Sequence, residues 1–185
     1  MQYELTTPCT AADLAPLKAG DTVLLSGVVY TARDQAHRRM LEALDKDEKL
    51  PFDLEGSAIY YVGPTPERPG EVIGSAGPTT SGRMDAMSPR LLDLGNKIMI
   101  GKGKRDAAVK EAVVRNGAVY LAALGGAGAL MAQSVKTLEV IAWPDLGCEA
   151  VRRLTVEKMP LMVILDAHGG DLYTSGPAAY LGTVK

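Results

Sequence analysis

Polar side chains able to hold an anion are concentrated in short segments that follow predicted strands. The densest is the run GPTTSGR at 77–83, which carries three hydroxyl groups and one guanidinium at the predicted start of a helix. Backbone N–H groups at a helix N-terminus and a forked arginine together suit a carboxylate or a phosphate. An ordinary Gly-Pro turn followed by a Ser/Thr helix cap is the alternative. Three further segments of this kind lie at 31–37, 101–105 and 166–171.

The run GKGKR at 101–105 combines glycines with cations and can form an anion-binding loop. A solvated basic turn is the alternative. The run lacks the Ser or Thr that follows the lysine of a P-loop, and the chain has no dinucleotide-binding glycine fingerprint, so nucleotide binding is disfavoured.

Arg33 lies just after a predicted strand, at the start of the following helix, and can bind a substrate carboxylate, or it can pair with Asp34 or Glu42 on the surface of that helix. His37 lies one helical turn after Arg33, where it is either a supporting partner or a surface residue.

The remaining glycine-rich and acidic segments carry weaker signals. The run GGAG at 125–128 lacks the flanking pattern of a dinucleotide site, so tight packing is the preferred interpretation. Asp166 and His168 lie almost side by side in sequence, which is weak evidence for a catalytic dyad.

Charge and cysteine content exclude several function classes. The chain has 185 residues and a formal net charge of −2, without the basic excess of a general nucleic-acid binder. Its two cysteines, Cys9 and Cys148, are too few to hold an iron–sulfur cluster alone. We expect both to be ordinary thiols, with Cys148 buried.

Hydrophobic patterning predicts alternating strands and helices that form a single mixed β/α domain of two or three layers. A Pro-rich loop joins the segments 57–62 and 71–76, which predicts a hairpin, and the tail after Gly169 is expected to be irregular. The expected strands are 22–30, 57–62, 71–76, 97–100, 118–122, 135–143 and 159–166, and the expected helices are 33–49, 81–94, 106–116, 125–133 and 146–154.

Four motifs occur in a characteristic order: TARDQAH at 31–37, GSAGPTTSGRMD at 74–85, IGKGK at 100–104 and LGGAGAL at 124–130. Together they resemble the β subunit of class I fumarate hydratase and L(+)-tartrate dehydratase, which is also the C-terminal domain of single-chain class I fumarases. The resemblance covers essentially the whole chain. It implies an α/β fold of the swivelling β/β/α type with a mixed sheet, in one domain over 1–185.

The resemblance also implies roles for particular residues. Thr79 matches the general base of the family, whereas Arg33, Arg83 and Lys102 match the groups that bind the substrate. Thr80, Lys104 and His37 are further candidates, because Thr80 and Lys104 lie close to the matched positions and His37 follows Arg33. No metal ligand is assigned to this chain.

The implied enzyme is a hydro-lyase that interconverts fumarate and (S)-malate, with L-tartrate to oxaloacetate as the alternative and a non-catalytic anion-binding module as a weaker one. The family's [4Fe-4S] cluster is ligated by three cysteines of an α subunit, so this chain is expected to act only with that partner, in a hetero-oligomer of α and β pairs. The expected substrate is a C4 dicarboxylate, and no nucleic acid or membrane is expected as a partner. No signal peptide is visible, which predicts a cytoplasmic location.

Overall fold

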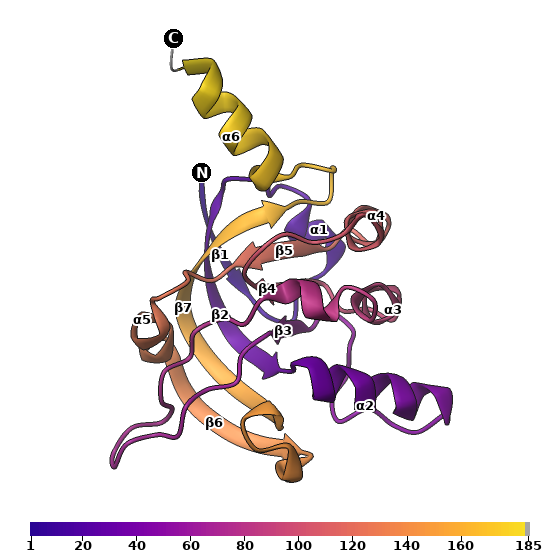
Figure 1. Ribbon diagram of the computed structural model, residues 1–185, viewed down its shortest axis with the longest axis vertical. Helices are drawn as coiled ribbons and strands as arrows, with labels where there is room; N and C mark the ends of the chain where they lie inside the picture. Colours follow the sequence, from indigo (N-terminus) through magenta and orange to yellow (C-terminus); the bar gives the residue numbers. More distant parts are fainter. Residues whose placement is uncertain (184–185) are drawn as a thin grey trace.

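Two long antiparallel strands, β2 (Thr22–Thr31) and β7 (Val151–Leu165), form the backbone of the fold in the computed structural model, which describes residues 1–183 (Figure 1). Both strands are rich in β-branched and other apolar residues, which suit an extended, half-buried backbone. Residues 22–31 of β2 pair with residues 152–162 of β7 almost without interruption.

Three short strands close the sheet between these two. The strands β3 (Ala58–Tyr60), β4 (Ile98–Gly101) and β5 (Val119–Ala122) lie parallel to β2, and β5 then pairs antiparallel with β7. The order β2-β3-β4-β5-β7 therefore closes on itself as a five-stranded barrel. Two further strands extend it: β1 (Gln2–Thr6) beside β2, and β6 (Val135–Ala142) beside β7.

The parallel strands are apolar on both faces, as expected for strands covered on both sides. Along β3 and its extension, Tyr60 points into the core inside the barrel, whereas Ile59 and Tyr61 point into a second core beneath the helices. In β4, Ile98 and Met99 divide in the same way between the inner and outer cores. This alternation follows from the two-residue period of a strand and fixes which side chains remain at its end.

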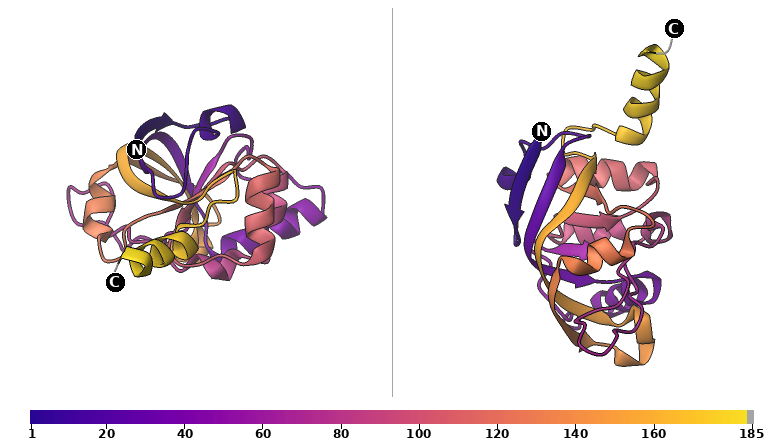
Figure 2. Two further views of the ribbon diagram at one scale, coloured as in Figure 1. Left: turned by 90° about the horizontal axis from the view of Figure 1, so that it is seen from above. Right: turned by 90° about the vertical axis from the view of Figure 1, so that its left-hand side faces the viewer.

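Helices cover the outer face of the parallel strands. Figure 1 shows α2 (Asp34–Asp45), α3 (Ser88–Asp93) and α4 (Ala107–Arg115) on one side of the barrel. The N-cap of α4 is Asp106, whose carboxylate accepts the Val109 N–H at 2.9 Å. The remaining helical pieces are α1 (Ala11–Leu14), η1 (Ser81–Met84), α5 (Gly128–Gln133), η2 (Pro144–Glu149) and α6 (Leu172–Thr183), the last of which projects away from the body (Figure 2).

The structure confirms the expected α/β class with a mixed sheet, but several element predictions are wrong. Residues 71–76 form no strand, so the predicted hairpin is absent, and an isolated antiparallel bridge pairs Val62 with Pro78 instead. In this loop the Thr65 N–H donates to the Ser75 carbonyl at 3.1 Å, and Gly74 packs so closely on Thr65 that an added Cβ would lie 2.4 Å from it.

Other differences concern helices. The predicted helix 81–94 is divided into η1 and α3, since Pro89 in the first turn of α3 has no N–H to bond the Asp85 carbonyl and cannot continue a helix from η1. Residues 151–154 belong to β7 rather than to a helix, because pairing with β2 and β6 outweighs their helical spacing of apolar residues. The tail after Gly169 forms α6, and β1 and α1 were not anticipated. No helix within residues 1–183 has both the length and the apolar character needed to cross a bilayer.

Candidate active site

The carboxyl ends of the parallel strands bring most of the sequence-predicted segments to one edge of the barrel. The segment 31–37 follows β2, 101–105 follows β4, and 124–128 follows β5. Loops at such an edge are the usual place for sites in α/β folds, because rigid strands position them. The fourth segment, 166–171, follows the antiparallel strand β7 and is not part of this grouping.

The run 77–83 lies between the residues that directly follow β3 and β4, namely Tyr61 and Lys102. The Thr79 N–H donates to the Tyr61 carbonyl at 2.7 Å, and an isolated parallel bridge pairs Thr80 with Lys102. The Ser81 N–H then donates to the Lys102 carbonyl at 2.9 Å. The two threonines and Lys102, separate in sequence, are thereby brought together. Because successive side chains of an extended segment point to opposite sides, this register puts Thr80 on the same side as Lys102.

Ser81 holds the two loops together from beneath. Its buried hydroxyl oxygen accepts the Lys102 N–H at 3.0 Å and lies 2.9 Å from the Tyr120 hydroxyl. A Cβ added at Gly101 would lie only 2.0 Å from the Ser81 Oγ, so a side chain at this position would displace the serine. The sequence placed Gly101 in a possible anion-binding loop and Ser81 either among the hydroxyls of an anion site or as a helix cap. The two small residues opposite each other were the signal it missed.

Arg33, the N-cap residue of α2, packs its side chain against the backbone of Gly63. A Cβ added at Gly63 would lie 2.5 Å from the Arg33 Nη1, so the guanidinium crosses directly over that backbone. The Arg33 Nη2 lies 3.5 Å from Glu149 Oε1, and the two side chains are 17% and 18% exposed. The second oxygen of Glu149 accepts the Gln35 N–H at 2.9 Å, which caps α2. Within residues 1–183 the Arg33 Nε is buried and has no hydrogen-bond partner.

The acidic partner of Arg33 is therefore Glu149, and neither Asp34 nor Glu42 pairs with it in the described part of the chain. Asp34 instead lies 3.5 Å from the Nη1 of Arg83, whose side chain is 57% exposed. Each candidate substrate arginine thus has one acid beside it, and both acids lie at the N-terminus of α2, where the helix dipole stabilises negative charge.

Unlike the two arginines, Lys102 and Lys104 have no acidic side chain paired with them among the described residues. The side chains of Lys102 and Lys104 are exposed, and among residues 1–183 neither forms an ion pair. Two paired arginines and two unpaired lysines leave this edge with excess positive charge, although the whole chain has a net charge of −2. That local excess suits a small dianion.

His37 is buried, so the surface alternative for this residue is wrong. We assign its Nδ1–H as the donor to the Arg33 carbonyl, at 3.0 Å, and its ring lies edge-on to Tyr61 at 5.3 Å. Burial lowers the pKa of His37 to about 4, and the nearby Arg105 acts in the same direction. His37 is therefore neutral near pH 7 and supports the backbone of Arg33.

Asp166 and His168 form a structural turn rather than a dyad. The Asp166 carboxylate accepts backbone N–H groups of Ala19, His168 and Gly170 at 2.8–2.9 Å. Burial opposes its ionisation, but these hydrogen bonds prevail and lower its pKa. The His168 ring binds the Ala15 carbonyl at 2.7 Å.

Two cavities, of about 440 and 450 Å³, flank the irregular loop 64–75. The first is bounded by that loop, α5 and β6, and the second by the loop, β6 and η2. Arg33, Thr79, Arg83 and Lys102 line neither of them, so the candidate site lies apart from both cavities.

The described residues contain no group of three or more His, Cys, Asp or Glu side chains that could hold a metal ion. Cys9 is buried, which raises its pKa to about 11, whereas Cys148 is exposed. The expectation that Cys148 is buried is therefore wrong, because it lies beside a cavity in η2, a short helix without buried residues. Two cysteines in such different surroundings do not fit an iron–sulfur cluster.

Comparison with known proteins decides the family. The sequence pattern of the fumarase C-terminus family matches residues 1–176. The chain belongs to this family. One fumarase C-terminus relative, from Methanocaldococcus jannaschii, is provisionally named L(+)-tartrate dehydratase subunit beta and is 43% identical over 170 residues, or 89% of this chain and 87% of the relative. The L(+)-tartrate dehydratase subunit beta of Escherichia coli strain K12 is 34% identical over 177 residues, or 93% of this chain and 87% of the relative.

Longer members of the fumarase C-terminus family are similar as well. The aerobic class I fumarate hydratase of Escherichia coli strain K12 is 37% identical over 164 residues, which cover 88% of this chain but 30% of that protein. Their names, fumarate hydratase and tartrate dehydratase, are those of hydro-lyases. The chain thus resembles a whole β subunit in one set of relatives and one part of a longer enzyme in the other.

Proposed function

We propose that this chain is the β subunit of an iron–sulfur-dependent hydro-lyase that reversibly hydrates fumarate to (S)-malate. In this proposal the chain supplies the clamp for the dicarboxylate and the general base. The observation that carries it is the pairing of the 77–83 run with the loop after β4, which brings the threonines and Lys102 together at the edge that also holds Arg33.

The clamp acts through charge and fork geometry. Arg33 and Arg83 each offer several N–H donors to a carboxylate, and a guanidinium binds a carboxylate in a fixed, two-point manner. Lys102 adds a compact charge that no acid neutralises within residues 1–183. The buried Arg33 Nε, which has no hydrogen-bond partner in the described part of the chain, supports this role, because an unused donor in a dry position gains most from an anionic ligand.

Proton transfer is assigned to the Thr79 hydroxyl oxygen. In the direction of water loss this oxygen takes the proton from the carbon next to the one that bears the hydroxyl. The electron pair of that C–H bond forms the double bond, and hydroxide leaves from the neighbouring carbon. A threonine hydroxyl is weakly acidic, so a nearby cation must stabilise its ionised form, and Arg83 and Lys102 are the candidates.

The family resemblance assigns a [4Fe-4S] cluster to this class of enzyme, as a Lewis acid at the leaving hydroxyl. The residues of this chain do not fit such a cluster, so we assign its ligands to an α subunit. The names of the two-chain relatives, which are beta subunits, support a hetero-oligomer. We place the assembly in the cytoplasm.

L-tartrate is the second candidate substrate, with oxaloacetate as product. The name of the Methanocaldococcus jannaschii relative favours it. L-tartrate differs from malate by one hydroxyl group, which a single hydrogen-bonding side chain on either subunit can recognise.

Two isosteric variants test the role of the threonine in the assembled enzyme. Replacing Thr79 by Val removes the hydroxyl but keeps the shape, and we expect kcat to fall by about 100-fold or more, as for loss of a general base. Replacing Thr80 by Val is the matched control and should leave kcat near the wild-type value. Loss of kcat in the Thr80 variant alone would assign the base to Thr80, and normal kcat in both would overturn the threonine mechanism.

A further inference from the structure

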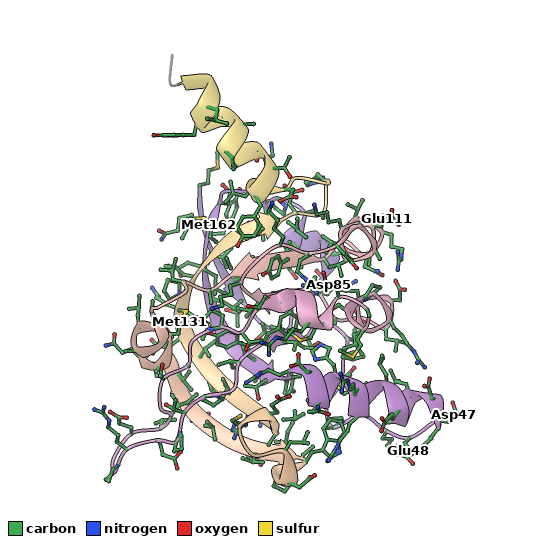
Figure 3. The ribbon with its side chains drawn as sticks, viewed as in Figure 1. Asp47, Glu48, Asp85, Glu111, Met131 and Met162 are labelled. Atoms are coloured by element: carbon green, nitrogen blue, oxygen red, sulfur yellow. The ribbon has the colours of Figure 1, made fainter. Side chains whose placement is uncertain are left out.

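The two loops of the candidate site are joined a second time, below the surface, by a buried ion pair. Asp85 directly follows η1, and Arg105 directly follows the run 101–104, so each residue lies where its loop leaves the site. Figure 3 labels Asp85, which lies inside the body of the molecule next to η1. The side chain of Arg105 is 0% exposed, and that of Asp85 is 12% exposed. A charge so well buried is costly unless its partners are complete.

Every arm of the Arg105 guanidinium is occupied. Its Nε donates to Asp85 Oδ1, its Nη2 donates to the Ser88 hydroxyl at 2.8 Å, and its Nη1 lies 3.3 Å from the sulfur of Met99. The second oxygen of Asp85 accepts the Asp106 N–H at 2.7 Å. One carboxylate therefore holds both the side chain at position 105 and the backbone of the next residue.

Aromatic rings extend this frame to the site itself. The Arg105 guanidinium lies 5.4 Å from the centre of the Tyr61 ring and 5.0 Å from that of Tyr120. The Tyr120 hydroxyl lies 2.9 Å from Ser81 Oγ and 3.0 Å from the Gly103 carbonyl, where it donates. Cation–π contact with Arg105 thus fixes the ring that holds both loops.

We propose that Arg105 and Asp85 are positioning residues that set the separation between the Thr79–Thr80 segment and Lys102. This inference rests on the proposed function for its catalytic meaning. The planar fork of arginine reaches Asp85 and Ser88 at once, which a lysine ammonium at the same place cannot do in the same geometry. Without the pair, the loops would be joined by the hydrogen bonds between Ser81 and Lys102 and by a Tyr120 ring that no longer packs on a fixed guanidinium.

If the ion pair served only to stabilise the fold, replacing both partners together would have a different effect from breaking the pair. Breaking a buried pair destabilises a protein, whereas replacing both partners by uncharged groups of similar volume is often neutral or stabilising. A double variant, Asp85→Asn with Arg105→Met, therefore separates the two roles. The introduced asparagine would keep an acceptor for the Asp106 N–H, and the introduced methionine would fill the buried space without a fork.

The experiment compares Arg105→Lys, Asp85→Asn and the double variant in two assays. Hydrogen exchange on the intact chain measures the amides of Ser81 and Lys102, which bond across the two loops. Steady-state kinetics of the assembled enzyme measure kcat and KM. The control is Asp93→Asn, because Asp93 pairs with Arg115 between α3 and α4, away from the site.

We expect exchange at the Ser81 and Lys102 amides to rise about tenfold or more in all three test variants, while core amides of the barrel change less. We expect kcat to fall by about 100-fold, as for a small misplacement of catalytic groups. The double variant should regain the wild-type melting temperature but neither protection nor kcat, and Asp93→Asn should match the wild type in both.

Recovery of loop protection and kcat in the double variant would overturn the inference, as would unchanged exchange in all three. If the wild-type assembly turns over neither fumarate nor L-tartrate, the proposed function fails. The exchange assay would then still decide whether the ion pair positions the loops.

Discussion

Acidification tests the support that His37 gives to the candidate site. The imidazole is fully buried, and its pKa is lowered to about 4 by burial and by Arg105, with Asp34 acting in the opposite direction. The unfolded chain takes up a proton at the ordinary value of about 6.5. Between these values the unfolded state binds more protons, so the stability from neutral His37 is complete above about pH 6.5 and is lost as the pH falls towards about 4.

The magnitude follows from the difference between the two pKa values. A lowering from 6.5 to about 4 corresponds to about 3 kcal/mol at full effect. Of this, about 2 kcal/mol should be lost between about pH 7.5 and about pH 5, where most carboxylates still keep their charge. This loss is a large fraction of the stability of a typical domain.

Urea unfolding at several pH values measures this directly. Replacing His37 by Asn keeps an N–H donor for the Arg33 carbonyl but removes the titrating ring, so the pH dependence in this window should flatten. The matched control is His168→Asn, which removes the other histidine and should keep the wild-type slope. Wild-type stability that is flat between about pH 7.5 and about pH 5, or an unchanged slope in the His37 variant, would refute this reasoning.

Two further predictions concern the neighbours of the candidate ligands. Replacing Glu149 by Gln removes a negative charge beside Arg33 and should lower KM for a dicarboxylate by about two- to fivefold, most clearly at low salt. The control Asp145→Asn, on the same segment, should leave KM unchanged. A rise in KM in the Glu149 variant would contradict the idea that Arg33 is a substrate ligand whose charge Glu149 neutralises. Replacing Gly101 by Ala places a Cβ 2.0 Å from Ser81 Oγ and should lower the free energy of unfolding by about 1–3 kcal/mol in urea melts. Wild-type stability and turnover in that variant would show that the loops can part without cost.

Local sequence patterns predicted correctly those helices and strands whose conformation depends mainly on their own residues. The helix expected at 106–116 is observed at 107–115, with Asp106 as its N-cap and Gly117 beyond its end at φ +57°. The strands of the barrel centre were equally visible as apolar runs. Predictions failed where distant pairing outweighs local preference, as in residues 151–154, which belong to β7 because β2 and β6 lie on either side of them.

The candidate site divides in a similar way. Motif order pointed to Arg33, Thr79, Arg83 and Lys102, and their assigned roles remain predictions. No local signal identifies Glu149 as the neighbour of Arg33, because the two are separated by most of the chain and meet only through the packing of η2 on α2.

The buried supports were also beyond local sequence reasoning. In the sequence, Arg105 is one of three cations in the run 101–105, and nothing local indicates that it is buried. The structure shows its guanidinium close to the rings of Tyr61 and Tyr120. Its pairing with Asp85 joins two motifs that the sequence shows as separate runs.

The most direct test of the central claim is anaerobic turnover by the chain with and without a partner. The chain is co-expressed with the α-type subunit of the same organism, iron and sulfide are reconstituted, and fumarate and L-tartrate are followed by ultraviolet absorbance. The account predicts that the pair converts one of these acids while the lone chain converts neither. Turnover by the lone chain, or an inactive pair whose α subunit carries an intact cluster, would contradict it.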